Sequence, residues 1–220
     1  QFLPEFKMLL FGNVPKLIVL VEFAGDSDYE VQKKAKELQE HLEFNDFCFS
    51  SRITKDKQEE KKYWDIRHDS FKLLRENIKG KRTAPFIDDI IVPIEHLHEF
   101  LPKLNIILDE YNLLFTVAGH IGSGNFHIIP LMDIHESNIA DIIFDISDRV
   151  YDLVLSYGGS ITAEHNDGIM RTPYLEKMFG KEMTNLFKEV KEIFDPQNIF
   201  NPNKKVGGTK KDIERYLIKN

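Results

Sequence analysis

Short apolar runs alternate with longer amphipathic segments along the chain. Apolar runs of six or seven residues predict β-strands over Leu17–Phe23, Phe47–Ile53, Ile87–Val92, Leu113–Ala118 and Phe126–Leu131. Between these runs and after the last one, apolar residues recur at helical spacing. They predict helices that begin at or near Asp28, Thr54, Ile94, Ile139, Thr172 and Lys181.

Capping residues, prolines and glycines indicate where these helices begin and end. Asp26, Ser27 and Asp28 each offer a cap to the first helix. Pro102 is expected to end or kink the helix that runs from Ile94 to about Tyr111. Asp133 with Glu136 has the spacing of a capping box before the helix at Ile139. Gly180 separates the last two helices.

The order of these elements favours an α+β fold. The runs on either side of the glycine-rich segment 119–124 are joined by a hairpin-length connection, which fits an antiparallel pair. We therefore predict a largely antiparallel, ferredoxin-like sheet with helices packed on one face, rather than a doubly wound parallel sheet. Residues 1–206 are expected to form one domain, followed by a polar C-terminal tail at 207–220 with a weak helical pattern.

Composition narrows the classes of function. The chain has 220 residues and a net charge of −7 without a basic stripe, which argues against a nucleic-acid partner. Cys48 is the only cysteine, which fits a reducing compartment. The longest apolar run, Leu17–Val21, is too short to span a bilayer, so no transmembrane segment is predicted. We expect a protein of the cytoplasm, or one held peripherally at a membrane.

Two histidines flank the glycine-rich segment, and Glu164-His165 follows a second glycine pair, Gly158-Gly159. A tight turn between two strands would bring His120 close to His127. Imidazole and carboxylate groups are compatible ligands for zinc and similar divalent metals. The alternative is a turn whose histidines bond only to the backbone, because short motifs often occur by chance.

Arg67 is a candidate ligand for an anion. It lies three residues after Trp64 and four before Phe71, which places it on the apolar face of its helix. A guanidinium there needs an anionic partner, either a carboxylate of the same protein or the carboxylate of a substrate. The sequence has no G-x-S-x-G nucleophile elbow, no G-x-G-x-x-G and no P-loop, so neither a serine hydrolase nor a nucleotide-binding site is predicted.

Several ordered motifs give the chain a resemblance to a known family. GHIGSGNFH at 119–127 resembles G-H-x-G-D-G-N-x-H, SITAEHNDG at 160–168 resembles S-x-x-x-E-H-G-x-G, and DPQNIFNPNK at 195–204 resembles D-P-x-x-I-L-N-P-G-K. Trp64 to Arg67 gives a W-x-x-R, followed by APFIDDIIVP at 84–93 and RTPYL at 171–175. The family is the C-terminal cap domain of FAD-linked oxidases of the vanillyl-alcohol oxidase type, in the D-lactate, glycolate and D-2-hydroxyglutarate dehydrogenase branch.

The resemblance implies roles for individual residues. His120, His127 and Glu164 are the implied ligands of a divalent metal, zinc-like or manganese. His165 is the implied base, and Arg67 the residue that holds the substrate carboxylate. Asn125 and Asn201, the asparagines of the first and third motifs, are assigned to cofactor binding. FAD itself is expected to be held by an N-terminal domain that is absent from this chain.

The chain departs from the family motifs at a few positions. Ser123 replaces an aspartate, Asn166-Asp167 replace a glycine and a small or apolar residue, and Asn203 replaces a glycine. Ile129 stands where some hydroxyglutarate-type members place a polar substrate contact. These departures concern the substrate and the loop that faces the flavin.

We therefore predict that the chain is the cap domain of a flavoenzyme that oxidises a small 2-hydroxy acid, such as D-lactate or glycolate, by metal-assisted hydride transfer to FAD. The isolated chain would be inactive without its flavin domain, and the sequence does not identify the electron acceptor. One alternative is a stand-alone module that binds a metal or a small acid without redox activity. Another is a structural domain whose histidines and arginine are satisfied internally.

Overall fold

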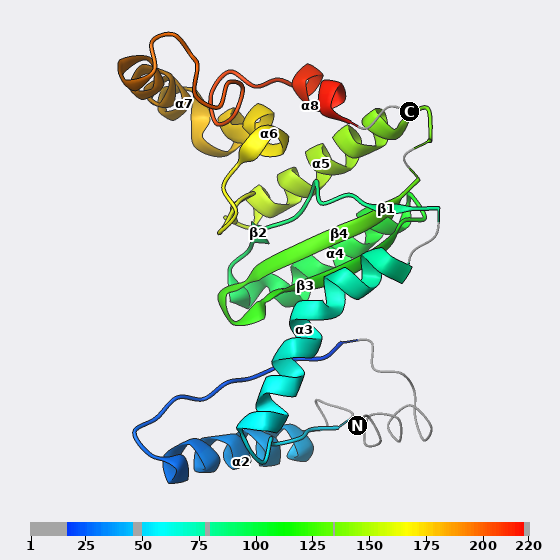
Figure 1. Cartoon of the computed structure of the whole chain (residues 1–220), viewed down its shortest axis with the longest axis vertical. Coiled ribbons are helices and arrows are strands. Elements are labelled where there is room, and N and C mark those ends of the chain that lie inside the picture. The colour runs from blue at the N-terminus through cyan, green and yellow to red at the C-terminus, as the bar shows by residue number, and fades with distance from the viewer. Residues whose placement is uncertain (1–16, 46–49, 78–79, 134, 218–220) are drawn as a thin grey trace. The chain divides into compact units, whose positions relative to one another are not determined.

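The structure is a computed structural model that describes residues 17–45, 50–77, 80–133 and 135–217. The chain divides into two compact units, residues 1–72 and 73–220. The α+β class and the antiparallel sheet predicted from the sequence are both confirmed (Figure 1).

The first unit contains α2 (Asp28–Phe44) and most of α3 (Lys57–Asn77). Of the three candidate caps, Ser27 is the N-cap of α2, and its hydroxyl accepts the backbone N–H of Glu30 at 3.3 Å. α3 begins three residues later than predicted, because Asp56 accepts the backbone N–H groups of Gln58 and Glu59 and so acts as a cap.

The strand predicted at Leu17–Phe23 is wrong. These residues form no regular structure, and Ile18 is 73% exposed. An apolar run becomes a strand only where a neighbouring strand takes its backbone hydrogen bonds, and the described part of this unit contains none. The predicted strand at Phe47–Ile53 lies partly outside the described residues, and residues 50–53 are not a strand.

The second unit is built on β4 (Asn125–Met132), which pairs antiparallel with β1 (Arg82–Thr83), β2 (Ile90–Ile91) and β3 (Leu114–His120) (Figure 1). The predicted pair of strands around the glycine-rich segment is thus confirmed. A short 3-10 turn, η2 (Ile121–Ser123), joins β3 to β4. Gly124 closes it at φ 74, where an added Cβ would lie 1.9 Å from the carbonyl oxygen of Val92, so only glycine fits.

The strand predicted at Ile87–Val92 is reduced to β2 by a bulge. Thr83 pairs with Leu131 and Ile90 pairs with Phe126. The chain advances seven residues from Thr83 to Ile90, whereas β4 covers the same distance in five residues, from Leu131 to Phe126. The two extra residues cannot pair with β4 and form a bulge. Asp89 stands at the end of the bulge with φ 64, a conformation that ends an extended strand.

Two helices cover one face of the sheet. η1 (Ile94–His96) leads into α4 (Leu97–Asp109), and α5 (Ile139–Ser156) packs beside it. Their apolar sides form one core with alternate residues of β4, including Phe100, Leu104, Phe126, Ile128, Ile146 and Val150. Of the two outcomes expected at Pro102, an end or a kink, the helix does not end: α4 continues through the proline. Burial of Leu104 and Leu108, each worth roughly 2 kcal/mol, offsets the cost of about 3 kcal/mol for a proline inside a helix.

The capping box predicted at Asp133 and Glu136 is also wrong. α5 starts later than these residues, after Asn138. The Asp133 carboxylate accepts the backbone N–H of His135 at 2.9 Å instead, which is an Asx-type turn.

The C-terminal part contains α6 (Gly168–Arg171), η3 (Thr172–Tyr174), α7 (Leu175–Phe194) and α8 (Lys210–Tyr216). Gly180, at φ 77, breaks α7 where the sequence predicts two helices. Ile213 of α8 is buried in the core. No helix in the described ranges has the length and apolarity needed to cross a bilayer.

Candidate functional site

The loop at 160–165 is fixed beside the sheet by a single carboxylate. Ser160 and Ile91 exchange backbone hydrogen bonds of 2.9 and 3.0 Å, so the loop starts in register with β2. Asp89, fully buried at the end of the bulge, then accepts the backbone N–H groups of the next residues. Its oxygens lie 2.9 Å from the nitrogen of Ala163, 3.1 Å from that of Glu164 and 2.9 Å from that of His165.

These bonds decide the charge state of Asp89. Burial by itself would raise the pKa of the carboxyl, because a charge is poorly solvated in the interior. The backbone N–H groups of the loop, together with the charge of Arg171, outweigh burial and hold the pKa below its usual value. Asp89 is therefore an anion, and it is occupied by the loop.

Glu164 and three histidines meet at one point. From the Oε1 atom of Glu164, the Nε2 atom of His127 lies at 3.0 Å, that of His165 at 3.3 Å and that of His120 at 3.7 Å. Strand pairing explains the positions of His127 and His120. Ala118 pairs with His127 and His120 pairs with Asn125, so both histidines lie on the face of the sheet opposite the core. Asp89 places the other two residues of the cluster, because it accepts hydrogen bonds from the backbone of Glu164 and His165.

Asp88 contacts the Nδ1 atoms of His127 and His165, on the side of each ring away from Glu164. Its Oδ1 atom lies 3.0 Å from Nδ1 of His127, and its Oδ2 atom lies 3.2 Å from Nδ1 of His165. The two rings are stacked, with centroids 4.7 Å apart and planes 8° apart. A carboxylate only accepts hydrogen bonds, so a ring that bonds to Asp88 donates its Nδ1–H, and the neutral form of such a ring has its lone pair on Nε2.

In that neutral form the lone pairs of the two rings face the Glu164 carboxylate, which is also an acceptor. Acceptors 3.0–3.3 Å apart repel each other unless a cation or additional protons lie among them. Within the described residues, ligand atoms of Asp89, His127, Glu164 and His165 all lie within 4.8 Å of one another. Asp89 is unsuited to a metal because backbone N–H groups take its oxygens. Imidazole nitrogens with one carboxylate are a donor set that suits zinc or manganese, so the residues fit such an ion.

Asn125 lies next to this cluster, at the start of β4. It is buried, and its Nδ2 atom donates to Asp89 and to the carbonyl oxygen of Ile90, both at 3.2 Å. Its Oδ1 atom has no hydrogen-bond partner in the described part of the chain.

Asn201 and Arg67 lie in other parts of the structure. Asn201 follows α7 in a turn, at φ 47 and exposed, and its side-chain oxygen accepts Lys204 Nζ at 3.3 Å. Arg67 belongs to the first unit, where it is half-buried on α3. The cofactor role of the two asparagines and the substrate role of Arg67 stay predictions.

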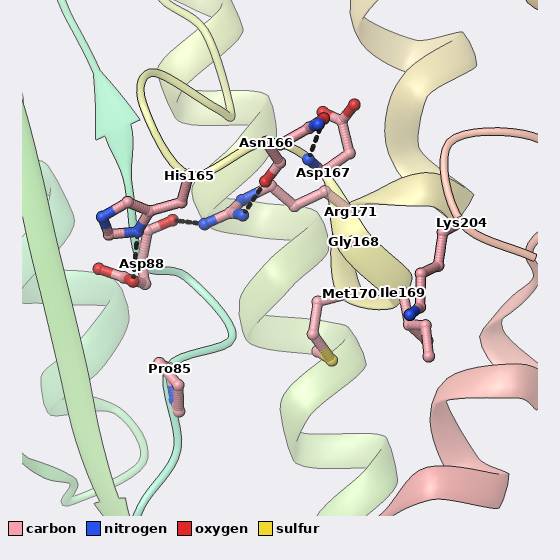
Figure 2. A pocket seen from close by; sticks show the side chains of 10 residues that line it. All are labelled: Pro85, Asp88, His165, Asn166, Asp167, Gly168, Ile169, Met170, Arg171 and Lys204. Atoms are coloured by element: carbon pink, nitrogen blue, oxygen red, sulfur yellow. Dashed lines mark hydrogen bonds and ion pairs between the residues drawn. The ribbon is translucent and has the colours of Figure 1, made fainter. Parts of the chain in front are cut away.

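Asp88, Asp89 and Arg171 belong to the site but have no role predicted from the sequence, although they lie in the motifs at 84–93 and 171–175. Arg171 is almost fully buried and donates to the carbonyl oxygens of Asn166, at 2.7 Å, and of Asp88. Figure 2 shows these bonds at a pocket next to His165 that Asp88, Arg171 and Lys204 help to line. A signal was present: two adjacent aspartates interrupt the apolar run 84–93, and buried charges need partners.

Known proteins resemble the chain over most of its length. The sequence model of the family described as FAD linked oxidases, C-terminal domain, matches residues 11–205. The D-2-hydroxyglutarate dehydrogenase of Haemophilus influenzae is 32% identical over 84% of the chain, which spans 18% of that relative. The probable mitochondrial D-lactate dehydrogenase of Danio rerio is 25% identical over 96% of the chain and 41% of the relative. The glycolate oxidase subunit GlcD of Bacillus subtilis is 31% identical over 56% of the chain and 26% of the relative.

Replacing Asp89 with asparagine should destabilise the second unit. The amide has one acceptor oxygen, so backbone N–H groups of the loop lose their partner, at a cost of about 2–4 kcal/mol. Because the pKa of Asp89 is lowered on folding, its contribution is complete above the unfolded value of about 3.9 and is lost as pH falls through the lower folded value. In urea titrations, the difference between wild type and Asp89→Asn should therefore be constant above about pH 4 and shrink below it.

Asp109→Asn, at an exposed position, is the matched control and should change the free energy of unfolding by about 0.5 kcal/mol or less. Equal effects of the two substitutions would contradict the anchoring role of Asp89.

Proposed function

The chain belongs to the family of FAD linked oxidases, C-terminal domain, and from that premise we propose that it forms the substrate side of a flavin-dependent 2-hydroxy-acid dehydrogenase. The relatives named as D-2-hydroxyglutarate dehydrogenase, D-lactate dehydrogenase and glycolate oxidase subunit support an α-hydroxy acid as substrate. The observation that carries the proposal is the convergence of His127 Nε2 and His165 Nε2 on Glu164, with both Nδ1 atoms on Asp88.

In this proposal His165 is the base. Its Nδ1 atom lies 3.2 Å from Asp88. When the ring donates Nδ1–H to that carboxylate, the lone pair on Nε2 can accept the proton of the substrate hydroxyl. The imidazolium formed at that moment lies between two carboxylates, Asp88 and Glu164, which stabilise the positive charge. Loss of the hydroxyl proton makes removal of hydride from the neighbouring carbon easier.

His120, His127 and Glu164 would hold a divalent metal, zinc or manganese, which supplies Lewis acidity toward the hydroxyl oxygen when bound. Support comes from the donor set and from the opposed acceptor atoms, which a cation would relieve. FAD, when bound, accepts the hydride. We propose that another domain carries the flavin, because the chain spans only 18% to 41% of these two dehydrogenase relatives. Asn125, with its unpaired Oδ1, and the exposed Asn201 are the proposed contacts to it.

The substrate is proposed to be a small acid with one carboxylate. Ile129 follows His127 by two residues on β4, so it lies on the same face of the sheet. An apolar side chain there cannot hydrogen-bond a second carboxylate. This argument favours D-lactate or glycolate over D-2-hydroxyglutarate, with Arg67 holding the carboxylate that all three acids share.

The flavin test uses the full-length protein. Addition of D-lactate should bleach the visible absorbance of the bound flavin, and His165→Gln should slow this reduction by roughly 10²–10⁴-fold, as expected for loss of a general base. His98→Gln, at an exposed histidine, is the control and should reduce at the wild-type rate. A flavin that no 2-hydroxy acid reduces would favour the alternative, a module that binds a metal or a small acid without redox activity.

The metal test uses the chain itself. Elemental analysis should find about one divalent ion per chain, lost in the double variant His120→Ala/His127→Ala because two of three ligands are removed. His96→Ala/His98→Ala removes two histidines of the same unit outside the cluster and should keep the ion. Equal metal content in both double variants would refute the assigned ligands.

Arg67 can be tested by a change that keeps its charge. In the full-length protein, Arg67→Lys should raise KM for D-lactate by roughly tenfold, because lysine cannot form the two parallel hydrogen bonds of a guanidinium with a carboxylate. Arg149→Lys alters a surface pair with Glu110 and should leave KM unchanged. An unaltered KM in Arg67→Lys would assign Arg67 to a structural role.

A further inference from the structure

One carboxylate serves two histidines with different proposed tasks. Asp88 directs one oxygen to Nδ1 of His127 and the other to Nδ1 of His165, at 3.0 and 3.2 Å. His127 is a proposed metal ligand, and His165 is the proposed base. Asp88 lies outside the two motifs that contain His127 and His165, and comes from the segment 84–93, in the bulge between β1 and β2.

Asp88 is itself held in place from both sides. Arg171 donates to the carbonyl oxygen of Asp88 and to that of Asn166, which links the bulge to the residue after His165 (Figure 2). Tyr151 of α5 donates to the carbonyl oxygen of Phe86 at 2.7 Å, which ties the bulge to the core. The next residue, Asp89, holds the backbone of Glu164 and His165. The Asp88 side chain is mostly buried, with 15% of its surface exposed, so it has little freedom to leave the two rings.

We propose that Asp88 is a positioning residue that fixes the Nδ1–H tautomer of both His127 and His165 and thereby directs both Nε2 atoms toward Glu164. This inference rests on the proposed function for the tasks of the two histidines, but the tautomers themselves can be measured without metal or flavin. Positioning by a carboxylate behind a ligating histidine is a general way of orienting a metal ligand. Here the same group also orients a base, so the two tasks depend on one side chain.

The chemistry of the amide makes this proposal testable. A carboxylate offers an acceptor to each ring, whereas asparagine offers one acceptor oxygen and one NH₂ group, which donates. In Asp88→Asn only one of the two rings can keep its Nδ1–H bonded to residue 88. The other ring meets a donor and must carry its hydrogen on Nε2, where the lone pair toward Glu164 is lost. Asp88→Glu keeps two acceptor oxygens and should keep both tautomers.

The first measurement is made on the chain with ¹⁵N-labelled histidine, in mildly alkaline buffer without metal. Long-range ¹H–¹⁵N spectra distinguish the two neutral tautomers and the imidazolium, and His127→Gln and His165→Gln assign the signals. In the wild-type chain both rings should be Nδ1–H. A wild-type ring found as Nε2–H or as imidazolium would overturn the proposal, and this result does not depend on whether any variant folds.

The second measurement compares variants by titration with Zn²⁺. Asp88→Asn should convert one ring to Nε2–H and weaken Zn²⁺ binding by about 10–100-fold, and Asp88→Glu should restore most of the affinity. Asp152→Asn removes a carboxylate of α5 that pairs with Lys177 and should change neither readout. Unchanged tautomers in Asp88→Asn would refute the role of Asp88 even if the flavoprotein oxidises hydroxy acids. Conversely, a flavin that no hydroxy acid reduces would refute the proposed function and leave the tautomer result standing.

Discussion

The site depends on a buried aspartate that has no catalytic task of its own. Asp89 lies inside the protein as an anion, and such a group is tolerated only when hydrogen bonds replace the water it has lost. The backbone N–H groups of residues 163–165 provide them. The electrostatic requirement of one buried charge therefore sets the path of the loop, and the loop path brings Glu164 and His165 to the histidines of the hairpin.

A bulge makes this arrangement possible. A regular strand from Arg82 to Ile91 would give its side chains alternately to the two faces of the sheet, and two successive aspartates could not both reach the same cluster. The two extra residues between β1 and β2, with Asp89 at positive φ, free both side chains from that alternation. Asp89 then holds the backbone of the loop, while Asp88 holds the histidine rings.

The sequence predicts features that depend on neighbouring residues, and it does not predict contacts between residues far apart in the chain. The helices, the hairpin and the approach of His120 to His127 follow from spacing and strand pairing, and all are present in the structure. The run Leu17–Phe23 is predicted to be a strand by composition alone, and this prediction is wrong because composition does not supply a partner strand. The roles of Asp88 and Asp89 depend on contacts with residues about 75 positions later. No periodicity encodes such contacts, although an aspartate pair in an apolar run indicates that partners must exist.

The departures from the family motifs can be judged by the same physical reasoning. Asn166 and Asn203 stand where glycine is usual, and both have positive φ, 64 and 62. Asparagine is among the residues that tolerate this conformation best, so the loops keep a backbone that glycine would allow. Ser123 replaces an aspartate and donates to the carbonyl oxygen of His120 at 3.0 Å, a bond that a carboxylate cannot make. The residues at 123 and 166 therefore keep the turns that carry His120 and His165.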